Sequence, residues 1–137
     1  MDTTLITELP QLQNKTLFTL NREADGIQAF LSTPATLEDP ASLTYRLNIL
    51  DSYLARLSDM LCLAKSLKEY ATGVYLTENE DRLSKLTATI SNRMIKKALY
   101  EFNITVDRLD MMYSTADHLA RDLQTQVSYI KQQMTMR

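Results

Sequence analysis

Five basic side chains occupy one stretch of the sequence with no acidic residue between them. They are Arg82, Lys85, Arg93, Lys96 and Lys97, and Tyr100 follows them. On a continuous helix, at about 100° per residue, the five lie within an arc of about 120°, and Tyr100 falls on the same arc. Guanidinium and ammonium groups near an aromatic ring suit a phosphate-bearing ligand, either single-stranded nucleic acid or a nucleotide. The alternative is a solvated face, or one paired with acids such as Glu23 and Asp25 on a neighbouring helix.

A second set of polar residues shares one face further along the same predicted helix. It consists of Asp107, Asp110, Ser114, His118, Arg121 and Asp122. A di-metal carboxylate site in a helical bundle uses Glu-x-x-His motifs on two helices, but this chain has one His and no such motif. We therefore expect a polar, solvated outer face without a metal, on which Asp117 and Arg121 form an ion pair one turn apart.

The sequence contains none of the common motifs of catalytic or nucleotide sites. It has no glycine-rich phosphate loop, no G-x-S-x-G, no H-E-x-x-H and no C-x-x-C. The single Cys62 cannot form an internal disulfide, and its apolar neighbours predict a buried small hydrophobe. We expect a protein that is not an enzyme, with no catalytic residue, no cofactor and no metal.

Helices must position these residues, because the 137-residue chain has only two Gly and three Pro and is 45% hydrophobic. Apolar spacing predicts an all-α fold in a single domain over 1–137, with helices at about 16–31, 40–72 and 78–134. Residues 1–15 form either a short helix or an extended arm. Asp39-Pro40 is a helix start, Gly73 a helix stop, and Thr77 to Glu80 a capping box for the third helix.

The predicted third helix is too long for a compact domain of this size. A helix over 78–134 spans roughly 85 Å, whereas a globular 137-residue domain is roughly 37 Å across. Either the helix kinks near residues 102–106, where helix propensity is low, or it overhangs and another chain covers its apolar stripe. We therefore predict an elongated bundle, a helical hairpin plus a long C-terminal helix, that forms a homo-oligomer, with a dimer favoured. The interface stripe is Leu109, Met112, Ala116, Leu119, Leu123, Val127, Ile130 and Met134.

Charge and hydropathy narrow the classes of partner. The net charge of −2 excludes a chain-wide basic footprint for duplex nucleic acid, although residues 42–100 hold nine basic and six acidic residues. The N-terminus lacks the features of a signal peptide, and no apolar run approaches the length of a membrane span. We expect a cytoplasmic protein without a membrane partner.

Two stretches carry a resemblance to a known class of proteins. One is residues 47–61, LNILDSYLARLSDML; the other begins at Asp107-Arg108-Leu109 and continues with residues 123–131, LQTQVSYIK. The chain resembles small, uncharacterised all-helical proteins encoded by phages and prophages of gut bacteria. That resemblance implies a phage accessory protein from a replication, recombination or host-takeover gene set, acting in the host cytoplasm. It assigns no functional residue.

Two functions follow as expectations. The first is a non-enzymatic accessory protein that binds a host or phage protein, for instance to inhibit a host defence complex. The alternative is a phosphate-ligand binder that uses Arg82 to Tyr100, either as an accessory factor for single-stranded nucleic acid or as a protein that sequesters a signalling nucleotide.

Overall fold

The chain is all-α, as the sequence predicts. The computed structural model describes residues 3–34 and 39–135, with side chains described from Thr16 onward, and these residues form helices and turns without a strand. The helices are α1 (Thr3–Leu31), α2 (Pro40–Glu78), α3 (Glu80–Ser84), α4 (Ala88–Ala98) and α5 (Tyr100–Thr135). Within these ranges no helix is both long enough and apolar enough to cross a lipid bilayer.

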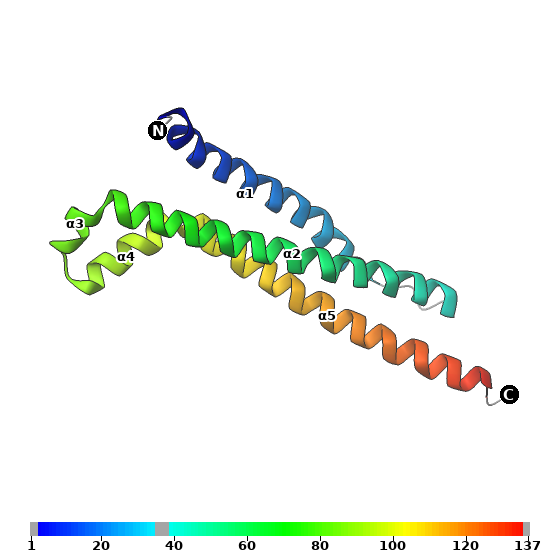
Figure 1. The fold of residues 1–137 in the computed structure, drawn as a ribbon. Helices are drawn as coiled ribbons and strands as arrows, with labels where there is room; N and C mark the ends of the chain where they lie inside the picture. Colours follow the sequence, from blue (N-terminus) through cyan, green and yellow to red (C-terminus); the bar gives the residue numbers. More distant parts are fainter. Residues whose placement is uncertain (1–2, 35–38, 136–137) are drawn as a thin grey trace.

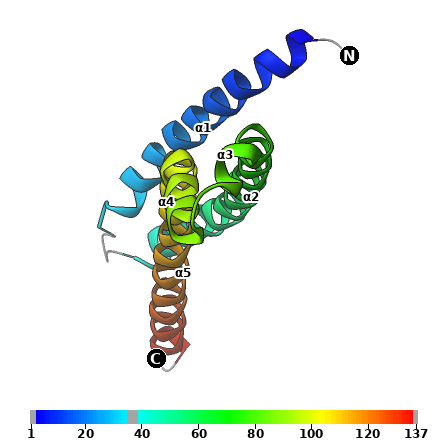
Figure 2. The ribbon, with the colours of Figure 1, turned by 90° about the vertical axis from the view of Figure 1, so that its left-hand side faces the viewer.

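The molecule is built on one long hairpin. Its two arms are α2 and α5, which run in opposite directions side by side (Figure 1). At 1.5 Å per residue the 39-residue α2 is about 58 Å long, and the 36-residue α5 is about 54 Å long. The short helices α3 and α4 turn the chain at one end, and α1 crosses the hairpin on the outside (Figure 2). Residues 79–99, which comprise α3, α4 and their turns, are called the hairpin tip below.

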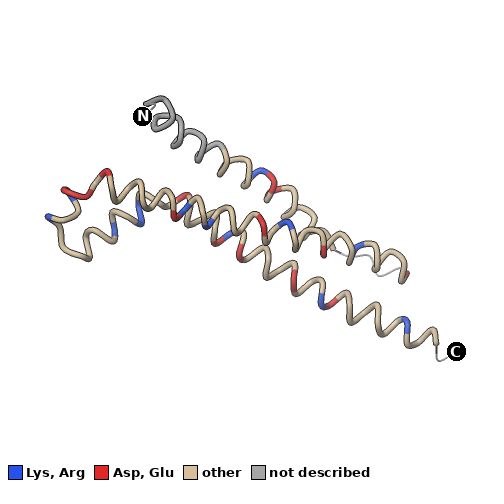
Figure 3. Tube along the Cα trace, in the orientation of Figure 1, with Lys and Arg blue, Asp and Glu red and all other residues tan. Residues whose placement is uncertain are grey.

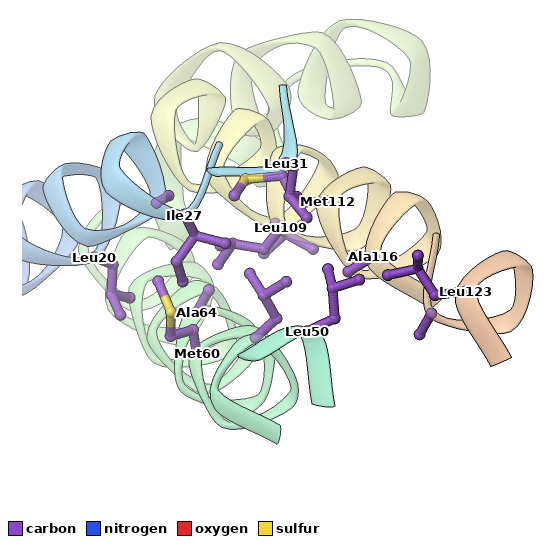
Figure 4. Packing of buried hydrophobic residues seen from close by; sticks show 14 of the residues in the cluster. Leu20, Ile27, Leu31, Leu50, Met60, Ala64, Leu109, Met112, Ala116 and Leu123 are labelled. Atoms are coloured by element: carbon purple, nitrogen blue, oxygen red, sulfur yellow. The ribbon is translucent and has the colours of Figure 1, made fainter. Parts of the chain in front are cut away.

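One buried cluster joins α1, α2 and α5 (Figure 4). In α1 the apolar residues that recur every third or fourth position are all buried, as the helical spacing predicts, and they are Leu17, Leu20, Ala24, Ile27 and Leu31. Every third or fourth residue of α2 faces the same cluster, and Leu50 and Leu57 are fully buried. Leu109 and Ala116 of α5, both also fully buried, close the cluster from the other arm. Apolar burial along these stripes is the main stabilising contribution.

The predicted end of the second helix is wrong. Helix α2 continues through Gly73 to Glu78, and Gly73 does not adopt the positive φ of a glycine helix stop. Thr77 is inside α2, where its hydroxyl donates to the Gly73 carbonyl oxygen at 2.9 Å, so it caps no helix. Leu67 and Ala71 explain the extension, because they pack against a second cluster that contains Leu99 and Phe102. The predicted start is correct, since Asp39 caps α2 and Pro40 is its first residue.

The predicted third helix is divided into three. It breaks between Ser84 and Ala88, where Thr87 caps α4 by accepting a bond from the Ile90 amide at 3.4 Å. The kink expected at 102–106 lies instead at Leu99, and the amide of Asn103 still donates to the Leu99 carbonyl across it. A bend there lets Leu99 and Phe102 both reach Leu17 of α1. Because the chain turns back at the tip, α5 returns along α2 and the overhang is avoided.

The predicted start of the first helix, at about residue 16, is wrong. Residues 3–15 are helical, but they form neither a separate short helix nor an extended arm, because α1 runs without a break from Thr3 to Leu31.

Several polar contacts fix α1 on the hairpin. Arg56 of α2 forms two bonds with Glu23, at 2.5 and 2.7 Å, and this bonding lowers the pKa of the Glu23 carboxyl. Arg108 of α5 bonds to Asp25 at 2.6 Å. Asn21 donates to the Thr105 hydroxyl at 2.9 Å, inside the interface of α1 with α5.

The stripe proposed as an interface between chains lies largely inside this chain. Leu109, Met112, Ala116, Leu123 and Val127 are buried in the main cluster. Leu119 and Ile130 are half-buried against it, and Met134, near the end of α5, is 65% exposed. A second chain is therefore not needed to cover the stripe, because α1 and α2 of the same chain cover most of it.

Candidate functional site

The basic residues predicted as a site gather at the hairpin tip, but they do not share one helix. Arg82 is in α3, Lys85 is the residue that directly follows α3, and Tyr100 is the first residue of α5. Only Arg93, Lys96 and Lys97 lie on one helix, α4, where at about 100° per residue they span an arc of about 100°. The break at residues 84–87 separates Arg82 and Lys85 from this arc. All six side chains are exposed, Tyr100 by 62%.

None of these five cations forms an ion pair with a described side chain. The three ion pairs among the described residues are Arg56 with Glu23, Arg108 with Asp25, and Arg121 with Asp117. Glu23 and Asp25, which the sequence offered as partners for the basic cluster, are therefore bonded to other arginines. Figure 3 shows basic residues and no acidic residue along α4. The tip thus presents positive charge that the chain does not neutralise within contact distance.

Helix α4, all of whose residues are described, contains no buried residue. Its sequence is nevertheless amphipathic: Ile90, Met94 and Ala98 recur every fourth residue. This spacing is typical of a helix edge that faces a core, but Ile90 is 46% exposed and Met94 is half-buried. Ile95 is the exception, because it packs against the cluster of Leu17, Leu99 and Phe102. One turn of α4 is thus anchored while its apolar edge stays uncovered.

Cations border this uncovered edge directly. At about 100° per residue, Arg93, Lys97, Ile90 and Met94 follow one another around α4 within an arc of about 100°. We call these four residues the α4 face. The arrangement places a row of two guanidinium or ammonium groups beside a row of two apolar side chains, each row one turn long. Such a face can bind a partner that offers both negative charge and apolar surface.

Other apolar side chains near the tip are also incompletely buried. Leu76, in the last turns of α2, is 41% exposed, and Leu83 and Leu86 are half-buried. The two buried clusters are built from other residues. We did not predict from the sequence that apolar side chains are more exposed at the tip than in the arms. The amphipathic pattern of residues 88–98, with basic residues next to its apolar edge, could have indicated this exposure.

The polar set on α5 forms an exposed outer face, as expected. Asp107, Asp110, Ser114, His118, Arg121 and Asp122 are all exposed. Asp117 and Arg121 form the predicted ion pair at 3.1 Å. In the described part of the chain, no group of three or more His, Cys, Asp or Glu side chains is arranged to hold a metal ion.

Cys62 is exposed, so the prediction that it is buried is wrong. The core residues of this part of α2 are Met60 and Ala64. Each is two residues from Cys62, about 200° around the helix, so Cys62 faces away from them.

A hollow of about 590 Å³ lies where the end of α1 meets the start of α2. Its charged side chains are already engaged. The Arg46 guanidinium lies 4.5 Å from the Phe30 ring centroid and donates to the Thr33 carbonyl, and Asp39 accepts from the Ser42 amide at 2.6 Å. These bonds to the backbone hold the pKa of the Asp39 carboxyl below its ordinary value of 3.8. The corner is therefore a structural joint between two helices.

The chain matches no protein-family model, no curated protein and no solved structure. The resemblance to phage proteins stays an expectation.

Proposed function

We propose that this protein is a non-enzymatic binding protein that attaches to a partner protein through the α4 face. The observation that carries the proposal is the combination of a 46%-exposed Ile90 with unpaired Arg93 and Lys97 on a helix without a buried residue. An apolar helix edge that its own chain leaves open is characteristic of interaction sites. The hairpin arms, which bury their own stripes, serve to hold this face away from the rest of the molecule.

The role implied by the phage resemblance fits the same surface. A phage accessory protein that inhibits a host defence complex would act by occupying a surface of that complex, and it would need no catalytic group. The α4 face is the part of this chain that we assign to that contact.

A single substitution tests the proposal. Proteins from a host lysate are captured on the wild-type chain, on Ile90→Asp and on Met111→Asp, the last being a matched control because Met111 is a 72%-exposed apolar residue on α5. We expect at least one protein to bind the wild type and the control but not Ile90→Asp. Since Ile90 is outside both clusters, Ile90→Asp should unfold within about 0.5 kcal/mol of the wild type, which circular dichroism checks. Identical captured sets for all three chains would disprove the proposal.

A second function is favoured by a different subset of the same residues. Arg93, Lys96 and Lys97 are exposed on one helix and Tyr100 lies just beyond it, which is the arrangement expected for binding a phosphate-bearing ligand. Single-stranded DNA and a cyclic dinucleotide are titrated at two salt concentrations. If this function is correct, reversing the charge of all three cations abolishes binding, whereas Ile90→Asp leaves it unchanged, because the isoleucine has no role in holding a phosphate.

A further inference from the structure

We infer that the partner element bound by the α4 face is an acidic amphipathic helix that lies along α4. This inference rests on the proposed function and names the chemistry of the partner. It goes beyond that function because it specifies both the charge of the bound segment and the spacing of its apolar residues.

The geometry of α4 determines the spacing expected for the apolar and acidic residues of the partner helix. Ile90 and Met94 are one turn apart, and so are Arg93 and Lys97, which gives two parallel rows along an 11-residue helix about 16 Å long. A second helix laid beside α4 repeats its side chains with the same pitch. Apolar residues three or four positions apart would pack on Ile90 and Met94, and carboxylates one turn apart would reach Arg93 and Lys97. Recognition would thus be by one amphipathic helix packing against another over about three turns.

The charge of the hairpin tip determines the sign of the charge expected on the partner segment. Between Arg82 and Tyr100 the chain has five basic residues and no acidic one. No described carboxylate forms an ion pair with any of the five. Glu80 and Asp81 are the two acidic residues within 79–99, so the hairpin tip has a net charge of +3. An acidic segment is therefore attracted to the tip before contact, while a basic segment is repelled.

Two other classes of partner fit the surface less well. A membrane-bound helix buries a broad apolar face to a depth of about 5–10 Å, whereas here Ile90 is the single strongly exposed large apolar side chain on α4. Glu80 and Asp81 of α3 also add negative charge to the hairpin tip, which disfavours an anionic lipid surface. Single-stranded nucleic acid is usually held by several stacked aromatic rings, whereas α3 and α4 contain none and the predicted basic site has one aromatic residue, Tyr100. The contiguity of Ile90 and Met94 with the cations favours a protein helix.

The test selects partners without assuming their sequence. A displayed library of random short peptides is panned against the full chain, and peptides that also bind the Ile90→Asp, Arg93→Glu, Lys97→Glu triple variant are discarded. We expect the enriched peptides to be net negative, with apolar residues three or four positions apart. Enrichment of neutral or basic peptides, or of acidic peptides without that spacing, would overturn the inference.

Affinity measurements on one enriched peptide complete the test. Arg93→Glu with Lys97→Glu should weaken binding by about tenfold or more, Ile90→Asp should also weaken it, and Lys131→Glu, an exposed basic control on α5, should change it less than about twofold. Binding unaffected by the double reversal would overturn the inference. The inference would also be overturned if vesicles rich in phosphatidylserine or single-stranded DNA bound the chain and lost binding equally on the same substitutions. That result would identify a membrane or a nucleic acid as the partner.

Failure of the inference and failure of the proposed function give different results. If captured proteins are lost with Ile90→Asp but the selected peptides are not acidic helices, the function stands and the assigned chemistry is wrong. If capture is insensitive to Ile90→Asp, the function itself is wrong.

Discussion

Asp39 shows how one side chain fixes the start of the longest helix. Its carboxylate accepts a bond from the Ser42 amide at 2.6 Å, which satisfies one of the unpaired donors at the N-terminus of α2. Pro40 follows at the first helical position, where its missing N–H costs nothing. Both residues were readable in the sequence, because capping depends on local chain chemistry alone.

Replacing Asp39 should therefore lower the melting temperature in a pH-dependent way. We expect Asp39→Ala to melt below the wild type at neutral pH, while Asp39→Asn, which keeps an accepting oxygen, melts close to it. The hydrogen bond lowers the pKa of Asp39 below 3.8, so the charged form stabilises the fold above that value and the contribution is lost as the pH falls through the lowered pKa. Thermal melts across this acid range should show the wild type approaching Asp39→Ala. A gap that stays constant in acid would contradict this account.

The buried stripes of the helices are predictable from the sequence, whereas the breaks between the helices are not. The stripe from Leu17 to Leu31 is buried as its spacing predicts, because period alone decides which side of a helix faces the core. Gly73 predicts a helix stop, yet Leu67 and Ala71, within the two turns before it, pack against Leu99 and Phe102, and this packing keeps α2 helical. The turn at 84–87 has no Gly or Pro to mark it. The sequence predicts the cations of the site. It does not predict the exposed apolar edge of α4, because that exposure depends on the turn at 84–87, which no residue type marks.

Gly73 gives a direct test of this account of α2. Because the residue is helical without a positive φ, and a Cβ added there would meet nothing within 4 Å, Gly73→Ala should raise the free energy of unfolding by about 0.5–1 kcal/mol. Urea unfolding followed by circular dichroism measures the change. Gly26→Ala in α1, equally open, should give a similar gain. A loss of stability with Gly73→Ala would show that α2 ends at this glycine after all.

The hairpin explains how the 137-residue chain avoids an unsupported long helix. The reversal at the tip places α5 against α2, so the stripe from Leu109 to Val127 is covered by the chain's own α1 and α2. Apolar surface that is buried within one chain gives stability independent of protein concentration, whereas surface buried between chains gives stability that rises with concentration. The two arrangements therefore differ in a measurable way.

The Leu109→Ala variant distinguishes burial of this stripe within one chain from its burial between two chains. Leu109 is fully buried, so its truncation should lower the free energy of unfolding by about 2–5 kcal/mol, a loss that a domain stabilised by about 5–15 kcal/mol can survive. The 65%-exposed Met134 supplies the control, and Met134→Ala should change stability by less than about 0.5 kcal/mol. Both are measured by urea unfolding at two protein concentrations about tenfold apart, with light scattering on the folded samples. We expect the midpoints to be the same at both concentrations, since the packing lies within one chain. Two other results together would instead place this stripe between two copies of the chain. They are a urea midpoint of the wild type that rises with protein concentration, and a Leu109→Ala chain that stays folded but has a different mass by light scattering.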